Sequence, residues 1–441
     1  MAGTGKGIDR QAAFSGTKPV APGLEIDSAA LEAYLIGHIE GFAGPVILSQ
    51  FKGGQSNPTY VVETPGHVYV LRRKPPGNLL PSAHAVDREY RVMAALDKQS
   101  FPVPHPYLLC EDDSVIGTAF YVMDKVDGRI VWEPHCPGME ALERTAVYDA
   151  MNATIAQLHS FDPETINLGD YGKPDNYLAR QVSRWSKNYA ASKTEDVPEM
   201  DRLMAWLPDN LPASGPARLV HGDFRLDNLI LSPDAPKVMA VLDWELSTLG
   251  DPLADFTYHL MQWVMPPTDD GSGTGSLVGH DLAALGIPSL EDYVAAYCKR
   301  TGRDGLPDLN RYFAYNFFRL AAILQGIVGR VRDAPYNRTA AAMARQVTPL
   351  ATWNWVQKAR AIMKNNVALA PQGAARLCAH PRSRSLRHQV SRCVSQVLPA
   401  GRGDRRAYAS GMSGKDIREQ TIAMFAKRTR PRRVAGAAAA G

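Results

Sequence analysis

The sequence of 441 residues lacks any apolar run of roughly 18 residues, the length that a membrane-spanning helix needs. Its first residues also lack the apolar stretch of a secretory signal, so we expect a cytoplasmic protein without a membrane span. Cysteine is scarce, and the five cysteines show neither the paired spacing of a zinc site nor that of a disulfide framework. We therefore expect reduced, structural thiols at Cys110, Cys136, Cys298, Cys378 and Cys393.

Charge is distributed unevenly behind a net value of +4. Residues 371–441 contain 15 of the 49 Lys and Arg residues but 3 of the 45 Asp and Glu residues, so this tail carries +12 and residues 1–370 carry −8. A mildly acidic body is not typical of nucleic-acid-binding proteins, and we expect no specific nucleic-acid partner. The composition of the tail predicts a basic, disordered extension. A nonspecific contact with nucleic acid or a membrane surface is the alternative.

The first part of the body is rich in strand patterns. Residues 1–23 are rich in Gly, Ala and Pro, and we expect a flexible N-terminus there. A helix is predicted next, with Asp27 or Ser28 as its cap. Runs of β-branched and aromatic residues, separated by Gly and Pro, then predict strands. The predicted helices span 27–41 and 84–99, and the predicted strands span 46–54, 59–64, 67–73 and 118–126.

From residue 128 onward helical patterns dominate, as at 141–160 and 312–330. Two short apolar strands interrupt them, one in RLVHGD and one in VMAVLDW. The apolar face of 312–330 predicts a packed core helix. The sequence therefore predicts an α+β protein in which a strand-rich lobe of about 100 residues precedes a helix-rich lobe of about 240, with lobe sizes read from these patterns.

The strongest chemical signal is LVHGDFRLDNLIL followed by VMAVLDWELSTLGDPLADF. Phosphoryl transfer from ATP needs a group that orients the acceptor hydroxyl and oxygen ligands that hold Mg²⁺ on the phosphates. Asp223 and Asn228 lie five residues apart in one loop, and Asp243 follows at the end of the next predicted strand. If these two strands pair as a hairpin, the three oxygen-bearing side chains meet at one edge.

This spacing matches the kinase arrangement of an aspartate, an asparagine five residues later and a metal-binding aspartate on a following strand. The sequence resembles the aminoglycoside phosphotransferase family of kinase-like enzymes, which includes choline kinases. It resembles more closely the kinase-like domain that precedes the acyl-CoA dehydrogenase module in some proteins, over roughly residues 24–365. The resemblance implies a protein-kinase-like two-lobed fold, with a nucleotide-binding N-lobe at 24–127, a catalytic C-lobe at 128–370 and the tail at 371–441.

The resemblance also implies roles for residues of the C-lobe motif. Asp223 stands at the position of the catalytic base, and Arg225 is placed to stabilise charge near the transferring phosphate. Asn228 and Asp243 stand at the positions of the magnesium ligands. ATP and Mg²⁺ are the implied cosubstrate and metal.

Three further aspartates of this region are expected to be structural. Asp255 in GDPLADF would brace the catalytic loop by accepting backbone hydrogen bonds. Asp227 is interpreted as a turn acceptor, and Asp251 as a helix cap.

In the N-lobe, the loop Gly53-Gly54-Gln55-Ser56-Asn57 lies between two predicted strands. Its backbone N–H groups are candidates to bind the nucleotide phosphates, with Gly53, Gly54, Ser56 and Asn57 as cofactor-binding positions. A Gly pair between strands also occurs in ordinary hairpins, so this signal depends on the C-lobe motif.

The strand at 67–73 should supply a cation that pairs with phosphate and with Glu89 of the next helix. Alignment to the kinase pattern assigns Arg72, where lysine is usual. A register slip would move the role to Arg73 or Lys74, although Arg73 would then point to the opposite face. An arginine can make this pairing, but it differs from lysine in geometry and hydration.

Met123-Asp124-Lys125-Val126 resembles the hinge between the lobes. Asp124 and Val126 are therefore candidates to bind adenine through their backbone groups.

The acceptor is less clearly indicated. The closer resemblance implies a hydroxyacyl-CoA as the acceptor. A CoA thioester would favour a basic rim beside the site, and the candidates for this rim are Arg180, Arg184 and Lys187. Basic residues at this spacing also occur on solvated helix faces. Two alternatives are an aminoglycoside- or choline-like small-molecule kinase, which acidic residues at the acceptor site would favour, and a nucleotide-binding pseudokinase, for which Arg72 is the only support.

Overall fold

The computed structural model describes residues 15–52, 57–76, 85–265, 267 and 275–333. The chain divides into two compact units, Met1–Asn366 and Val367–Gly441, and all described residues belong to the first. The predicted phosphate loop at Gly53, Gly54 and Ser56 and the predicted disordered tail lie outside the described residues.

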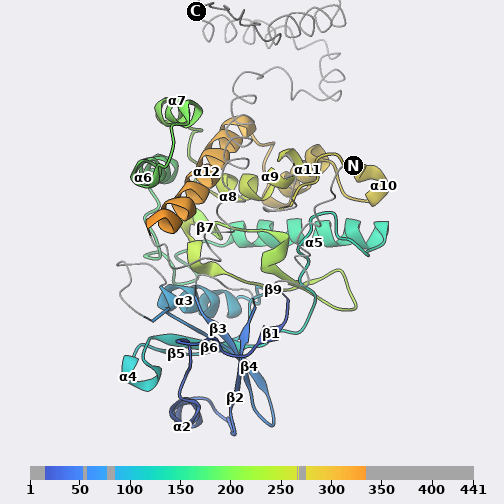
Figure 1. Ribbon diagram of the computed structural model, residues 1–441. Helices are drawn as coiled ribbons and strands as arrows, with labels where there is room; N and C mark the ends of the chain where they lie inside the picture. Colours follow the sequence, from blue (N-terminus) through green and yellow to red (C-terminus); the bar gives the residue numbers. More distant parts are fainter. Residues whose placement is uncertain (1–14, 53–56, 77–84, 266, 268–274, 334–441) are drawn as a thin grey trace, which may run out of the picture. The chain divides into compact units, whose positions relative to one another are not determined.

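The strand-rich lobe contains a six-stranded antiparallel sheet in the order β1-β2-β3-β4-β6-β5 (Figure 1). The four predicted strands are confirmed as β2, β3, β4 and β6. Two further strands were not predicted, β1 inside the N-terminal segment and β5 at the far edge. The strands span Thr17–Lys18 (β1), Ile47–Phe51 (β2), Thr59–Glu63 (β3), Val68–Arg73 (β4), Pro106–Cys110 (β5) and Phe120–Asp124 (β6).

Helices pack on both faces of this sheet. Helix α2 (Ser28–His38) is capped by Asp27, which accepts hydrogen bonds from two backbone N–H groups, and it buries Leu31 and Leu35 against one face. Helix α3 (Val86–Asp97) contacts β5 and β6 on the other face and also reaches the helix-rich lobe. Because side chains alternate along β4, Leu71 joins the core under α2 whereas Val70 joins the core under α3.

The helix-rich lobe begins with α5 (Ala141–Ser160), whose bounds match the predicted helix. The predicted core helix is also confirmed: α12 packs against α6 and α8, and Phe313, Phe317 and Phe318 are buried. The other helices are α4 (Asp113–Ile116) in the first lobe and α6 (Tyr177–Ser192), α7 (Pro198–Trp206), α8 (Pro252–His259), α9 (Met261–Val264), α10 (Leu282–Leu285), α11 (Leu290–Thr301) and α12 (Leu309–Asp333), with short 3₁₀ turns η1 (Leu207–Asp209), η2 (Leu226–Asn228) and η3 (Trp244–Leu246).

The short strands of this lobe pair differently from the predicted hairpin. Strand β7 (Arg218–Val220) pairs with β10 (Thr248–Gly250), and β8 (Leu229–Leu231) pairs with β9 (Val238–Val241). The prediction was wrong because Leu229–Leu231 itself forms a strand. This strand lies nearer to β9 in the sequence and takes the pairing edge that had been assigned to β7.

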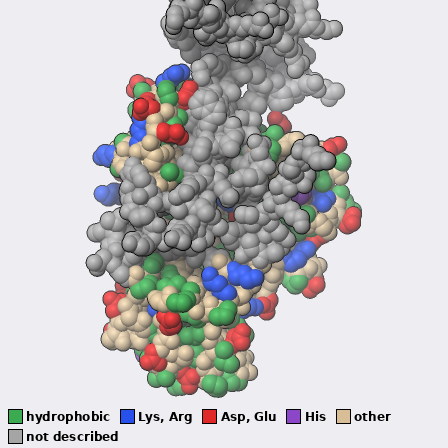
Figure 2. All heavy atoms as spheres, in the orientation of Figure 1, with side chains coloured by type: hydrophobic (Ala, Val, Ile, Leu, Met, Phe, Trp, Pro, Cys, Tyr) green, Lys and Arg blue, Asp and Glu red, His purple; other side chains and the backbone are tan. Residues whose placement is uncertain are grey.

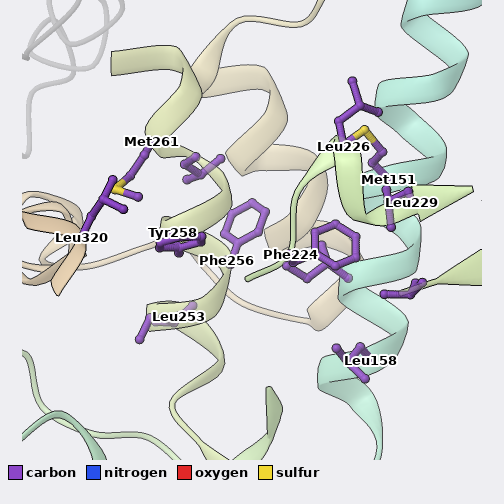
Figure 3. Packing of buried hydrophobic residues seen from close by; sticks show 14 of the residues in the cluster. Met151, Leu158, Phe224, Leu226, Leu229, Leu253, Phe256, Tyr258, Met261 and Leu320 are labelled. Carbon is purple, nitrogen blue, oxygen red and sulfur yellow. The ribbon is translucent and has the colours of Figure 1, made fainter. Parts of the chain in front are cut away.

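The core of the helix-rich lobe fixes the loop between β7 and β8. Phe224 of this loop is fully buried and belongs to one cluster with Phe256 and Tyr258 of α8 and Met151 and Leu158 of α5 (Figure 3). Burying a phenylalanine side chain contributes about 2–3 kcal/mol. The loop is therefore anchored by apolar packing against α5 and α8.

None of the helices described is long and apolar enough to cross a membrane. The coloured part of the surface in Figure 2 mixes acidic, basic and apolar side chains, with red and green atoms interspersed over the strand-rich lobe. This mixed surface agrees with the mildly acidic composition of residues 1–370.

Candidate active site

The loop that follows β7 is held by one buried carboxylate of α8. Asp255 accepts the backbone N–H of His221 at 2.7 Å and that of Gly222 at 2.8 Å, and His159 lies 3.2 Å from the same carboxylate. Burial alone would raise the pKa of Asp255, but the hydrogen bond and charge of His159 hold that pKa below its usual value. Asp255 thus makes the bracing contacts that were predicted for it.

Gly222 occupies a position that excludes a side chain. Its φ is +85°, in the left-handed region, and a Cβ here would lie 2.8 Å from the carbonyl oxygen of Leu246. Its own carbonyl accepts a hydrogen bond of 2.6 Å from Arg319, a buried residue of α12. The loop is therefore fixed from α8 on one side and from α12 on the other.

Asp223 and Asn228 are directly connected. The Asn228 amide Nδ2 donates to the backbone oxygen of Asp223 at 2.9 Å and to its Oδ2 at 3.2 Å. Burial raises the pKa of the Asp223 carboxyl, while the Arg225 guanidinium and the Tyr258 hydroxyl oppose that rise. With Nδ2 engaged in this way, the Oδ1 atom of Asn228 is the amide atom suited to bind a cation.

Asp243 lies next to Asn228 because of the β8–β9 ladder. Leu229 pairs with Val241, and the Leu242 N–H donates to the Asn228 carbonyl at 2.8 Å. Asp243 itself has φ 65° and ψ 60°, a left-handed conformation that is rare for a residue with a side chain and often found at functional sites. The buried Trp244 beside it donates to the Val241 carbonyl at 2.9 Å and anchors the turn.

Two protein oxygens, one from Asn228 and one from Asp243, make a donor set that fits Mg²⁺. This cation usually takes one or two carboxylates from the protein and completes its shell with water and substrate phosphates. In the part of the chain that the structure describes, no cluster of three or more His, Cys, Asp and Glu residues could hold a metal. Among the described residues, this donor set fits a nucleotide-bound magnesium better than a zinc-type centre.

The expected pairing of Arg72 with Glu89 is present. The two side chains form an ion pair of 3.0 Å, and Glu89 also accepts hydrogen bonds from Asn57 at 2.8 Å and from Tyr121 at 3.1 Å. Burial raises the pKa of Glu89 to about 7, against the effect of the Arg72 charge. Asn57 is fully buried, so its side chain acts by positioning Glu89.

Arg72 also reaches across to the other lobe. Its Nη2 lies 2.8 Å from Asp243 Oδ1 and 3.4 Å from Glu245 Oε2. Arg73 lies on the opposite face of the sheet, where it donates to the Leu24 carbonyl at 2.8 Å and stacks over Tyr60. Of the two neighbouring arginines, only Arg72 is therefore in the cleft.

Arg225 and Asp227 form a paired unit. The Arg225 Nε donates to Asp227 Oδ1 at 2.9 Å, and the second guanidinium nitrogen pairs with Oδ2. Asp227 is thus the partner of Arg225 as well as a residue of a turn. Asp251 caps α8 through the Leu253 N–H at 2.9 Å, as the sequence predicts.

At the predicted hinge, the backbone N–H of Asp124 already donates to the His105 carbonyl at 2.9 Å. The Asp124 carboxylate accepts from Tyr107 at 2.6 Å and lies 2.9 Å from a His67 nitrogen. For adenine, the Asp124 carbonyl and the Val126 backbone therefore remain as the candidate groups.

The candidate basic rim lies on α6. Arg184 and Lys187 are exposed, Arg184 stacks over Trp185, and Arg180 donates to the Lys173 carbonyl. These contacts are those of a solvated helix face. In the sequence Arg319 was noted only as part of the apolar helix at 312–330, and His159 and Tyr258 were not singled out, because single polar residues within apolar helices do not show which loop they meet.

Comparisons with known proteins agree with this geometry. Residues 47–309 match the model of a family described as the phosphotransferase enzyme family. A crystal structure of a provisionally assigned aminoglycoside phosphotransferase from Ralstonia eutropha is 48% identical, covers 76% of this chain and 99% of its own, and superposes with a TM-score of 0.67. A choline kinase from Cryptosporidium parvum, 11% identical, has the same fold with a TM-score of 0.53, over 77% of this chain and 97% of its own.

Curated relatives are longer than this chain. Mouse acyl-CoA dehydrogenase family member 10 is 46% identical over 318 residues, which are 71% of this chain and 29% of the relative. Human acyl-CoA dehydrogenase family member 11 is 44% identical over 317 residues, 70% of this chain and 40% of the relative. The chain therefore spans well under half the length of these relatives.

Proposed function

The chain belongs to the phosphotransferase enzyme family, and from that premise we propose that it transfers phosphate from ATP, with Mg²⁺, to a hydroxyl group of a small molecule. The observation that carries the proposal is the meeting of Asp223, Asn228 and Asp243 at the mouth of one loop, opposite Arg72 of the other lobe. Phosphoryl transfer requires these groups, and here Asp223 contacts Asn228 while Asp243 contacts Arg72.

In this proposal Asp223 aligns the acceptor hydroxyl and accepts its proton. Its raised pKa strengthens it as a base. Arg225 lies close enough to lower that pKa and is held by Asp227, so its positive charge has a fixed position beside the reacting groups. This fixed charge supports its candidate role near the transferring phosphate.

Asn228 Oδ1 and Asp243 are the residues that would hold Mg²⁺, which neutralises charge on the phosphate oxygens. Arg72, fixed by Glu89 at its Nε, is placed to direct Nη2 from Asp243 to a phosphate oxygen. The carbonyl of Asp124 and the backbone of Val126 are the proposed adenine contacts. Gly53, Gly54 and Ser56 remain proposed phosphate contacts, outside the described residues.

We propose a hydroxyacyl-CoA as the acceptor, a class consistent with the acyl-CoA dehydrogenase names of the curated relatives. A small hollow adjoins the catalytic loop, and Trp132, Pro134, Met261 and Met265 contribute apolar surface to it. Its carboxylate, Asp227, is paired with Arg225. A polycationic aminoglycoside would need several acidic partners, so an acceptor with an apolar portion fits this lining better.

The alternative class, a nucleotide-binding pseudokinase, rested on the arginine at position 72. Arg72 nevertheless makes the ion pair with Glu89 that an active arrangement requires. The geometry therefore favours an enzyme.

The proposal is tested by measuring ATP consumption and phosphorylated product with hydroxyacyl-CoAs, aminoglycosides and amino alcohols as acceptors. We expect Mg²⁺-dependent transfer to a hydroxyacyl-CoA, and a loss of at least about 100-fold in turnover for Asp223→Ala with ATP affinity largely retained. Wild-type turnover by Asp223→Ala would refute the assignment of the base, and preference for an aminoglycoside would refute the acceptor class.

A further inference from the structure

The hollow beside the catalytic loop contains one polar group that stands out from its neighbours. Its wall includes the paired Arg225 and Asp227, the side chains of Tyr258 and His259, and Gln262 of α9. The side-chain Nε2 of Gln262 is buried and makes no hydrogen bond. A buried donor without a partner is costly, so a ligand atom that accepts its hydrogen bond would be bound selectively.

The other polar groups of the wall are already engaged. The charges of Arg225 and Asp227 compensate each other. His259 lies 2.8 Å from the Tyr293 hydroxyl, and burial lowers the pKa of its imidazole to about 3, so it is neutral near pH 7. Among the described lining residues, the wall therefore offers a ligand no uncompensated charge but one unused amide donor.

Gln262 is held in a defined place relative to the reacting groups. Its backbone carbonyl accepts the Leu277 N–H at 2.8 Å. It follows Tyr258 by four positions across the nearly continuous helical turns of α8 and α9, so both side chains lie on the same side, roughly 6 Å apart at their Cβ atoms. The Tyr258 hydroxyl lowers the pKa of Asp223 through a hydrogen bond, so Gln262 neighbours a residue that interacts with the base.

We propose that Gln262 is a specificity-determining residue of the acceptor site, and that its Nε2 donates a hydrogen bond to a carbonyl oxygen of an uncharged acceptor portion that lies a few bonds from the reacting hydroxyl. This inference rests on the proposed function and deepens it. The apolar side chains of Trp132, Met261 and Met265 then contact the carbon chain between the two oxygens. Asp223 and Gln262 together thus select an acceptor that carries a hydroxyl and a carbonyl at a fixed separation.

The test compares binding of two probes by calorimetry without nucleotide. One probe is a short-chain 4-hydroxyacyl-CoA thioester, and the other is the matching thioether with a methylene in place of the carbonyl. We expect the wild type to bind the thioester about tenfold more tightly, the value of one neutral hydrogen bond, and Gln262→Met to bind both probes equally. Gln157→Met on the exposed surface of α5 is the matched control and should keep the wild-type preference.

Equal discrimination by the wild type and Gln262→Met would overturn the inference, as would failure of the wild type to bind the thioester or tighter binding of an aminoglycoside. Phosphorylation of the bound thioester is then measured separately with ATP and Mg²⁺. Binding that depends on Gln262 without phosphate transfer would refute the proposed function and leave the inference in place. Equal rates of phosphate transfer to the thioester and the thioether would support the proposed function and overturn the inference.

Discussion

At the scale of single residues, the arginine at position 72 is the most informative departure from the kinase pattern. Its guanidinium forms an ion pair with Glu89 through Nε and ion pairs with Asp243 and Glu245 through Nη2. A lysine ammonium is a single point charge and cannot hold partners at separate nitrogen atoms of a planar fork. With arginine instead of lysine at position 72, this side chain can contact Glu89 of α3 and two carboxylates of the helix-rich lobe at the same time.

Arg72→Lys is expected to weaken MgATP binding about tenfold and to reduce the free energy of unfolding by about 1–2 kcal/mol, because a hydrogen-bonded carboxylate loses its partner. Calorimetry with the nucleotide and urea unfolding measure the two effects. Arg73→Lys is the matched control on the opposite face of β4, where it contacts Leu24 and Tyr60, and it should leave nucleotide affinity unchanged. Undiminished affinity in Arg72→Lys would contradict the role.

Residue spacing in the sequence was enough to identify the contacts that rest on local pattern. Asp251 as a cap follows from its position before α8, whereas the bracing role of Asp255 was implied by the family resemblance. Asn57 was assigned to the phosphate loop through its backbone, and that assignment stays a prediction; its side chain contacts Glu89, 32 positions away. This contact joins two segments that are distant in the sequence, and no sequence pattern links them. Only the folded structure therefore shows it.

At the scale of elements, α8 concentrates ionisable groups on one side. Asp251, Asp255 and His259 recur every four residues, so they share a face of the helix. They cap the helix, hold the catalytic loop and contact Tyr293, respectively. One helix of eight residues therefore positions most of the loop that carries the proposed base.

The pH dependence of stability should reveal the buried imidazole of α8. Burial lowers the pKa of His259 to about 3, whereas the unfolded chain has the ordinary value near 6.5. Below pH 6.5 the imidazole of His259 takes up a proton in the unfolded state but not in the folded state. The stability that the neutral imidazole contributes is therefore complete above pH 6.5 and is lost as the pH falls. Between pH 7.5 and pH 5 the wild type should lose about 2 kcal/mol more than His259→Gln, measured by urea unfolding.

The buried carboxyls whose pKa is raised, such as Asp223, change stability in the opposite direction, but they are common to both proteins and cancel in the comparison. Equal losses in the wild type and His259→Gln would show that the imidazole is protonated in the folded state.

The ends of α5 were predicted correctly, whereas α12 extends beyond the predicted helix at 312–330 at both ends. The pairing of the short strands was not predicted correctly, because three residues such as Leu229–Leu231 have no recognisable period, and their pairing is decided by which segments the surrounding helices bring together. That is why the hairpin was assigned to the wrong strands while the meeting of Asn228 and Asp243 was still anticipated.

At the scale of the whole molecule, the described residues form two lobes joined by side chains as well as by the chain. Arg88 of α3 donates to the Tyr171 carbonyl at 2.7 Å and stacks over the Tyr171 ring, and Arg72 reaches Asp243. The two-lobed fold was predictable because the change from strand patterns to helical patterns near residue 128 is abrupt.

Removal of residues 371–441 should leave the melting temperature and turnover close to those of the full-length chain. This segment is rich in arginine and small residues and poor in apolar periodicity, so it is not expected to contribute to the core. Thermal unfolding and the ATP assay on the truncated protein test this. A fall in melting temperature of more than about 4 °C, which corresponds to roughly 3 kcal/mol for a body of this size, would show that the tail packs on it.

The contacts of Arg72 also bear on how nucleotide enters. In the cleft a single guanidinium faces the carboxylates of Glu89, Asp243 and Glu245, so negative charge is in excess there. A bare triphosphate would meet strong electrostatic repulsion, whereas a triphosphate already chelated by a divalent ion carries less negative charge and would be repelled less. The metal would then be part of the incoming complex, and its arrival would release the arginine to the phosphates.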